Sequence, residues 1–223
     1  MIHAFDTTFV DEDQFLKRHI CNGEVDYRAA KEDPMLDSIM YRYAALPEKR
    51  FKSFSKNVRL AALINLYNCA TIKLIVDHFP IGSIRDIPDA WKKRRIDFIG
   101  KKVSLDQIEH EMLRKNFDEP RIHFALVCAA KSCPELRKGA FTPSELEIQL
   151  EAAGKKFLMD TTKNSFGEKK LSLSKIFSWY GDDFIKRYGG FEQYVKQRYG
   201  INGSYRIVYR EYDWSLNQTD CSR

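Results

Sequence analysis

Apolar side chains recur every three or four residues over residues 55–78, the longest such stretch in the chain. This spacing places them along one face of an α-helix, and further apolar residues flank that face. A helix that is apolar on several sides belongs in a protein interior. The pattern therefore predicts a buried central helix, with a face formed by Val58, Ala62, Asn65, Cys69, Ile72 and Val76.

Shorter patterns predict further elements on both sides of this helix. Two prolines bound an amphipathic helix at 34–46, and Ser104 with Gln107 forms a capping box that opens another. Residues 48–56 have no clear period and are assigned to a loop. The remaining expected elements are helices at 9–21, 142–159, 176–188 and 191–199, a hairpin at 95–99 and 101–104, and strands at 170–173 and 205–209.

The most apolar run follows Pro120 and ends at a polar turn that holds Cys133. Its length and its flanking breakers favour a buried central strand over residues 122–130. Side chains alternate along a strand, so His123 and Cys128 are expected on opposite faces. Cys133 followed by Pro134 is typical of a helix N-terminus, where the helix dipole favours a thiolate.

The mixture of helices and strands has no βαβ rhythm. It predicts an α+β fold with one domain over residues 1–223, in which several helices surround a small, mainly antiparallel sheet. The motif-bearing core is expected at about 55–217 and a helical part at 9–46. Hydrophobic residues make up 43% of the sequence, which is enough for a substantial core.

Charge and hydropathy narrow the classes of partner and compartment. A net charge of +6, with 31 acids among 37 basic residues, does not identify a nucleic-acid binder. The basic run at 91–95 is interpreted as a solvated hairpin flank. No apolar run approaches the ~20 residues of a membrane span, and the first residues lack a signal peptide's pattern. As numbered, the sequence suggests a soluble cytoplasmic protein, with export still open if a signal has been removed; its oligomeric state is undetermined.

The chain has five cysteines without the spacing of a metal site. We therefore expect no metal and no cofactor. Cys128 and Cys133 lie five residues apart across a turn. Either a disulfide between them or a free, reactive Cys133 fits this spacing.

Two features have a structural as well as a functional interpretation. Asn65 and Asn68 lie on an apolar helix face, where an unsatisfied amide costs about 1–3 kcal/mol, so each needs a partner in a loop or in a ligand. Arg121 and Arg114 could hold a carboxylate or phosphate through two parallel bonds. Pairing with a nearby acid such as Glu109 would make Arg121 purely structural.

A catalytic set can be assembled around Cys133. A nucleophilic thiol needs a base within hydrogen-bond reach and a group that orients the base. His110 is the candidate base, and Glu109 or Asn68 is the candidate orienting group. His110 could equally be a helix-surface residue, and Cys133 an inert thiol or half of a disulfide.

Several phrases occur together in the order that one known family shows. They are ALINLYN (62–68), SLDQIEH (104–110), PRIHFALVC (120–128), SCP (132–134), LSKIF (173–177) and YDWSLN (212–217). Over about residues 11–217 the chain resembles the family named domain of unknown function 547. The resemblance brings no established activity, but it singles out a set of positions: Asn65, Asn68, Glu109, His110, Arg114, Arg121, His123, Cys128, Cys133 and Asp183.

From these observations we expect a cysteine-dependent hydrolase or acyl transferase of the papain- or transglutaminase-like kind. Cys133 would be the nucleophile, His110 the base and Glu109 the orienting group. Asn68, Arg121 and Arg114 would contact an unidentified substrate. The alternative is a non-catalytic module that binds a peptide, a glycan or an acidic partner.

Overall fold

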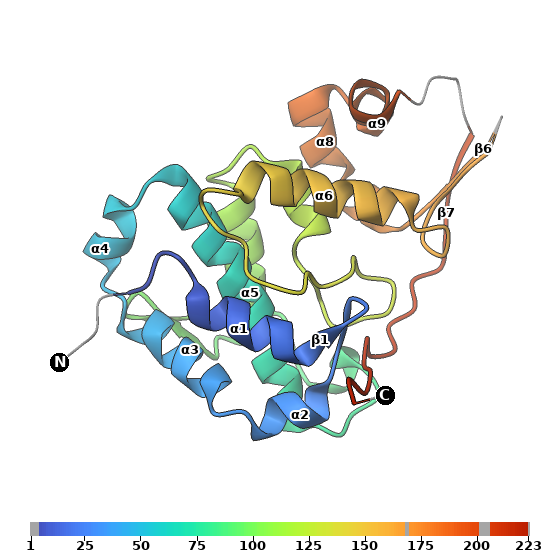
Figure 1. Ribbon diagram of the computed structural model, residues 1–223. Coiled ribbons are helices and arrows are strands. Elements are labelled where there is room, and N and C mark those ends of the chain that lie inside the picture. Colours follow the sequence, from blue (N-terminus) through green and yellow to red (C-terminus); the bar gives the residue numbers. More distant parts are fainter. Residues whose placement is uncertain (1–4, 168–169, 201–205, 223) are drawn as a thin grey trace.

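Helix α5 (Lys56–His78) runs through the interior of the protein (Figure 1). A computed structural model describes residues 5–167, 170–200 and 206–222 of the chain. The Ser55 side chain caps the helix by accepting a hydrogen bond from Val58 N. The length and composition of α5 would suit a membrane span, but 89% of its apolar window is buried inside the protein, as in a core helix. The predicted central helix is confirmed.

The N-terminal part wraps one side of α5 with short helices (Figure 1). The expected helices at 9–21 and 34–46 are confirmed, whereas the expected loop at 48–56 is wrong. That segment forms a helical turn and a half, which Pro47 initiates and the Glu48–Lys52 ion pair at 2.9 Å supports. The elements are α1 (Val10–His19), α2 (Tyr27–Glu32), α3 (Met35–Ala45) and α4 (Glu48–Ser53).

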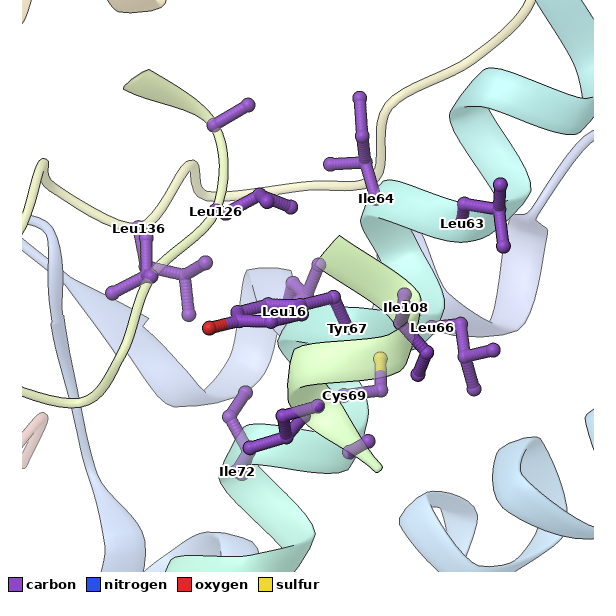
Figure 2. Close-up of a cluster of buried hydrophobic side chains, with 14 of the residues drawn as sticks. Leu16, Leu63, Ile64, Leu66, Tyr67, Cys69, Ile72, Ile108, Leu126 and Leu136 are labelled. Carbon is purple, nitrogen blue, oxygen red and sulfur yellow. The ribbon is translucent and has the colours of Figure 1, made fainter. Parts of the chain in front are cut away.

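Apolar side chains from the N-terminal helices and from segments that follow α5 in the sequence pack around α5. Figure 2 shows Tyr67 of this helix among buried apolar residues that include Leu16, Ile108 and Leu126. The same cluster contains residues of the N-terminal helices, and it also contains Leu216 near the C-terminus. A second, smaller cluster is rich in phenylalanine and lies under the C-terminal helices, with Phe124 at its centre.

The strands are short and, within the part of the chain that the structure describes, form three separate sheets. Three strand pairs are antiparallel, and β6 pairs with β7 in parallel. The hairpin around Gly100 is confirmed, and the strand predicted at 205–209 is described from Arg206 onward, because Tyr205 lies outside the described residues. The fold is α+β, with helices rather than a central sheet forming the core. The strands are β1 (Ile20–Cys21), β2 (Glu24–Val25), β3 (Ile96–Phe98), β4 (Lys101–Val103), β5 (Ser165–Phe166), β6 (Lys170–Leu173) and β7 (Arg206–Tyr209).

The apolar run after Pro120 is not a strand. It forms the 3₁₀-helix η3 (Pro120–Phe124) and then an irregular loop that joins another segment through a single bridge, Ala130 to Leu216. The loop can be irregular and buried because a side chain, that of Asn68, bonds its backbone in place of a neighbouring strand. The predicted alternation of His123 and Cys128 is therefore wrong.

The turn at Cys133 leads into an extended loop instead of a helix. Residues 134–137 have no regular structure, so the expected dipole effect on the Cys133 thiol is absent. The next helix, α6 (Leu146–Met159), begins four residues later than predicted. The Ser104–Gln107 capping box is confirmed, with both of its bonds present, and it opens the π-helix η2 (Gln107–Arg114).

The C-terminal helices and a short 3₁₀ turn complete the fold. The helix predicted at 176–188 breaks at Tyr180 into two, and the one at 191–199 is confirmed. The elements are η1 (Ile84–Asp86), α7 (Ile176–Trp179), α8 (Gly181–Tyr188) and α9 (Phe191–Tyr199).

Candidate functional site

A cavity of about 320 Å³ lies where six segments of the chain converge, and it gathers most of the chemistry-bearing residues. The segments are α5, the turn at Trp91, η2, η3 with the loop that follows it, α7 and the C-terminal segment. Its lining includes Tyr67, Trp91, Asp106, Glu109, His110, His123, Leu126, Cys128, Cys133, Pro134, Ile176, Trp179, Tyr180, Tyr212 and Trp214. A second cavity, of about 330 Å³, lies between α3, α5 and β3, and its lining contains neither histidine nor cysteine.

Cys128 and Cys133 form a disulfide in the wall of this cavity, with a Cα–Cα distance of 6.3 Å. The chain brings them together by a tight turn, in which Cys133 N donates to Ala130 O at 3.0 Å and Ala129 has a φ of 61°. A left-handed alanine is uncommon and marks a turn that its surroundings hold in place. Of the two alternatives that the sequence left open, the structure contains the disulfide. Cys21 and Cys221 form another, and Cys69 is buried and free.

The sulfur of Cys133 receives two hydrogen-bond donors. The backbone N–H of Cys128 lies 3.0 Å from it, and the hydroxyl of Tyr212 lies 3.2 Å from it. The C-terminal segment is positioned by backbone bonds from Lys131 to Ser215 and from Ser132 to Asp213. Donors aimed at a sulfur stabilise its thiolate form once the disulfide is opened.

His123 is held between two carboxylates. Its Nε2 lies 2.7 Å from Asp183 Oδ2, and its Nδ1 lies 4.0 Å from Glu109 Oε1. Tyr180 stacks on the ring at 3.8 Å between centroids. Burial lowers the pKa of His123, against the opposing effect of Asp183, so the imidazole stays neutral near pH 7.

Asp183 is itself anchored by Arg114, which donates two bonds to it at 2.7 and 3.0 Å. Partial burial alone would raise the pKa of Asp183, but the bonds from His123 and Arg114 outweigh it and hold this pKa well below its usual range. An ionised Asp183 can only accept, so the proton of neutral His123 resides on Nε2 and its Nδ1 is the free base.

Glu109 is a buried carboxylate in the cavity wall, with 6% of its surface exposed. Burial, and then the negative charge of Glu109, raise the pKa of Tyr180 and of Tyr67. Both hydroxyls therefore remain protonated and can donate toward this carboxylate.

His110 has partners other than a cysteine. Its Nδ1 accepts from Arg114 Nη1 at 3.1 Å, because an arginine can only donate, and its Nε2 lies 3.9 Å from Asp106. The side chain is 42% exposed at the cavity rim. Among the hydrogen bonds of the described residues, none joins His110 or His123 to a cysteine sulfur. Nδ1 of His110 is thus engaged by Arg114, whereas no hydrogen bond found within the described residues engages Nδ1 of His123.

The two buried asparagines of α5 each hold a loop in place through hydrogen bonds to its backbone. Asn68 bonds Ala125 O at 2.9 Å and Val127 N at 3.0 Å, while Asn65 clamps both backbone groups of Phe141 in the same way. Asn68 therefore positions the loop that leads to Cys128 and does not line the cavity.

Arg121 is enclosed by acids, with 4% of its side chain exposed. It makes paired bonds to Glu119 and to Glu147 at 2.6–2.7 Å and another to Glu151 at 3.3 Å. The expected structural pairing is present, with these partners instead of Glu109. Arg121 and Arg114 are both occupied within the protein.

Sequence reasoning missed the aromatic part of the site. All three tryptophans of the sequence line the cavity, together with Tyr180 and Tyr212. Part of the signal was present in the phrase at 212–217, which contains Tyr212 and Trp214. The other rings come from separate segments, so their proximity was not visible in the sequence. Among the described residues, no group of three or more His, Cys, Asp or Glu is placed to hold a metal ion.

Comparison with known proteins gives one match. Neither the curated proteins nor the solved structures contain a match to this chain. Residues 51–158 match the model of the family described as "Protein of unknown function, DUF547", a region that includes α5, Glu109, His123 and both cavity cysteines. The resemblance seen in the sequence is thereby confirmed over residues 51–158, which is just under half of the chain.

Proposed function

We propose that the cavity is the active site of a cysteine-dependent hydrolase or acyl transferase, in which Cys133 is the nucleophile. The observation that supports this most is the placement of two hydrogen-bond donors on the Cys133 sulfur, in a cavity that also holds an imidazole oriented by Asp183. A nucleophile, a base and a group that orients the base are the three parts that such catalysis needs.

In this proposal His123 is the base in place of His110. Its Nδ1 takes the proton of the Cys133 thiol, and Asp183 and Glu109 stabilise the imidazolium that results. The thiolate attacks an acyl carbon, and the imidazolium returns the proton to the leaving group. Water or a second nucleophile then attacks the thioester, giving up its proton to His123 and releasing Cys133.

The enzyme must be reduced before it can act. The Cys128–Cys133 disulfide blocks the nucleophile, so an external thiol reductant has to break the S–S bond and become oxidised in turn. Each cysteine then carries a thiol, and the Cys133 thiol can ionise beside Tyr212 and Cys128 N–H. The disulfide form is thus the resting state of this site.

Labelling with iodoacetamide after reduction tests the proposal. We expect rapid labelling of Cys133, with an apparent pKa below the usual ~8.5, and its loss in Cys133→Ser. His123→Ala should slow the labelling and shift its pH profile, whereas His78→Ala, an exposed histidine outside the cavity, should leave both unchanged. A Cys133 thiol that titrates like a free cysteine would refute the catalytic role.

The aromatic lining favours a second candidate, a non-catalytic binding module. Three tryptophans in one cavity provide a large apolar contact area, which recognition alone would explain. In that case Cys133→Ser would retain the ligand affinity of the wild-type protein, and the Cys133 thiol of the reduced protein would be no more reactive than a free cysteine.

A further inference from the structure

Four rings form a connected aromatic cluster on one side of the cavity. Tyr212 lies 4.6 Å from Trp214 and 4.8 Å from Trp179 between ring centroids, and Trp91 packs edge-on against Trp214 at 5.7 Å. These rings are not sealed in the core, since Trp179 is 46% exposed. An exposed aromatic cluster at a cavity commonly marks a place where a ligand is bound.

The charges at this cavity have one sign. Asp106 and Glu109 line it, and none of the described residues in its lining is a lysine or an arginine. This is notable in a chain of net charge +6, in which basic residues outnumber acids. Glu109 is almost fully buried, so its charge acts across a poorly hydrated space where attraction to a cation is strong.

The face of Trp214 in this cluster, and that of Tyr180 elsewhere in the cavity lining, already attract cations inside the protein. The guanidinium carbon of Arg85 lies 5.5 Å from the ring centroid of Trp214, and that of Arg114 lies 5.3 Å from that of Tyr180. Neither arginine lines the cavity. Aromatic rings attract cations through the negative potential of their faces, most strongly in tryptophan.

We infer that the cavity binds the cationic group of its ligand, an ammonium or guanidinium group, between the aromatic cluster and the Glu109 carboxylate. The inference names the substrate class of the proposed active site and rests on that proposal for its catalytic meaning. Binding itself needs no thiol chemistry. An acidic ligand would face Asp106 and Glu109 without a compensating basic side chain in the lining.

Tryptophan fluorescence provides a direct test, because every tryptophan in the chain lines this cavity. The oxidised full-length protein is titrated with three compounds of the same shape: choline, its neutral analogue 3,3-dimethylbutanol, and the anion 3,3-dimethylbutyrate. We expect choline to bind at least about tenfold more tightly than the neutral analogue, and the anion more weakly than either. Equal affinities for the three compounds, or a preference for the anion, would overturn the inference. So would the absence of any response to choline at about 10 mM, a concentration at which even a weak specific site would be occupied.

Matched variants test whether the preference for choline comes from the Glu109 carboxylate. Glu109→Gln should reduce the preference for choline about fivefold or more while leaving the affinity for the neutral analogue unchanged. Glu111→Gln, an exposed change on the same helix outside the cavity, should alter neither. If Glu109→Gln does not fold, Asp106→Asn, whose side chain is 34% exposed, takes its place.

The two proposals fail in different ways. Choline binding by Cys133→Ser together with an unreactive Cys133 in the reduced wild type would leave the cation site standing and remove the catalytic role. A reactive Cys133 in a protein without a preference for cations would do the reverse.

Discussion

His123 and Asp183 lie 60 residues apart in sequence, and the Nε2 of one is 2.7 Å from the carboxylate of the other. The bond joins η3 to α8 and sets the tautomer of a buried imidazole at the cavity wall. It also closes a chain of contacts from Arg114 through Asp183 to His123 and Glu109. This chain places a base, with its free nitrogen toward a carboxylate, in the same cavity as the two cysteines.

Stability should fall between pH 7.5 and pH 5 because of His123. Burial lowers its pKa in the folded state, so the unfolded chain, with a histidine pKa near ~6.5, takes up the proton first. The stabilisation that comes from burying neutral His123 is present above about pH 6.5 and is lost as the pH falls below this value. Asp183, whose folded pKa is also lowered, loses its contribution only below about pH 4.

Urea midpoints at the two pH values measure this effect. We expect the decrease to be smaller in His123→Gln than in wild type and unchanged in His78→Gln. A His123→Gln protein as sensitive to pH as the wild type would show that the buried imidazole is not responsible.

Tyr212→Phe should raise the pKa of the reduced Cys133 thiol. The change removes the hydroxyl that lies 3.2 Å from the sulfur and keeps the ring. One lost hydrogen bond to a charged group is worth about 1.5–3 kcal/mol, so a rise of about one to two pKa units is expected. Iodoacetamide labelling across pH measures it, with Tyr209→Phe, an exposed tyrosine, as the control. An unchanged thiol pKa would remove Tyr212 from the site chemistry.

The two disulfides should differ in their effect on stability. Cys21–Cys221 closes a loop of 200 residues and Cys128–Cys133 one of five, and constraint of the unfolded chain grows with loop length. Thermal unfolding under oxidising conditions should therefore show a larger loss in Cys21→Ser, about 2–5 kcal/mol, than in Cys128→Ser. The opposite order would mean that the short bridge holds the native loop together by itself.

Asn68→Ala should destabilise the protein and loosen the cavity wall. It leaves the carbonyl of Ala125 and the N–H of Val127 without partners in the interior, at a cost of about 1–3 kcal/mol each. Asn65→Ala removes an equivalent clamp on Phe141, which does not line the cavity. Chemical denaturation should show similar losses for both, while hydrogen exchange near Cys128 should rise only in Asn68→Ala. Equal exchange in the two variants would contradict the positioning role.

Arg121→Lys should reduce stability without changing ligand binding in the cavity. Lysine cannot reproduce the paired bonds to Glu119 and Glu147, and the acids are left partly uncompensated. A loss of about 2–4 kcal/mol in urea unfolding is expected. The choline titration should be unaffected, and a weaker affinity for choline would instead make Arg121 part of the ligand site.

Local patterns were sufficient where a segment's own side chains decide its structure. The helical period of 55–78, the capping box at Ser104 and the hairpin at Gly100 all appear as predicted, because spacing and capping act within a few residues. The amides of Asn65 and Asn68 needed internal partners on energetic grounds alone, and they have them.

Only the tertiary structure decided the conformation of the apolar run after Pro120. Length and apolarity favoured a strand, but a strand needs a neighbour for its backbone, and here the Asn68 side chain takes that role. The loop that results turns His123 and Cys128 toward one cavity. Likewise, the sequence of Cys133 and Pro134 suggested a helix start, whereas bonds to the distant segment at 213–215 hold an extended turn.

The candidate site also depends partly on the sequence and partly on the tertiary structure. The sequence determined which residue types were available: two close cysteines, a few histidines, buried acids and scarce tryptophans. Their convergence brings together residues up to 147 positions apart in the sequence, such as Tyr67 and Trp214, which line the same cavity. No local pattern encodes such a meeting, because it results from the packing of whole elements around α5.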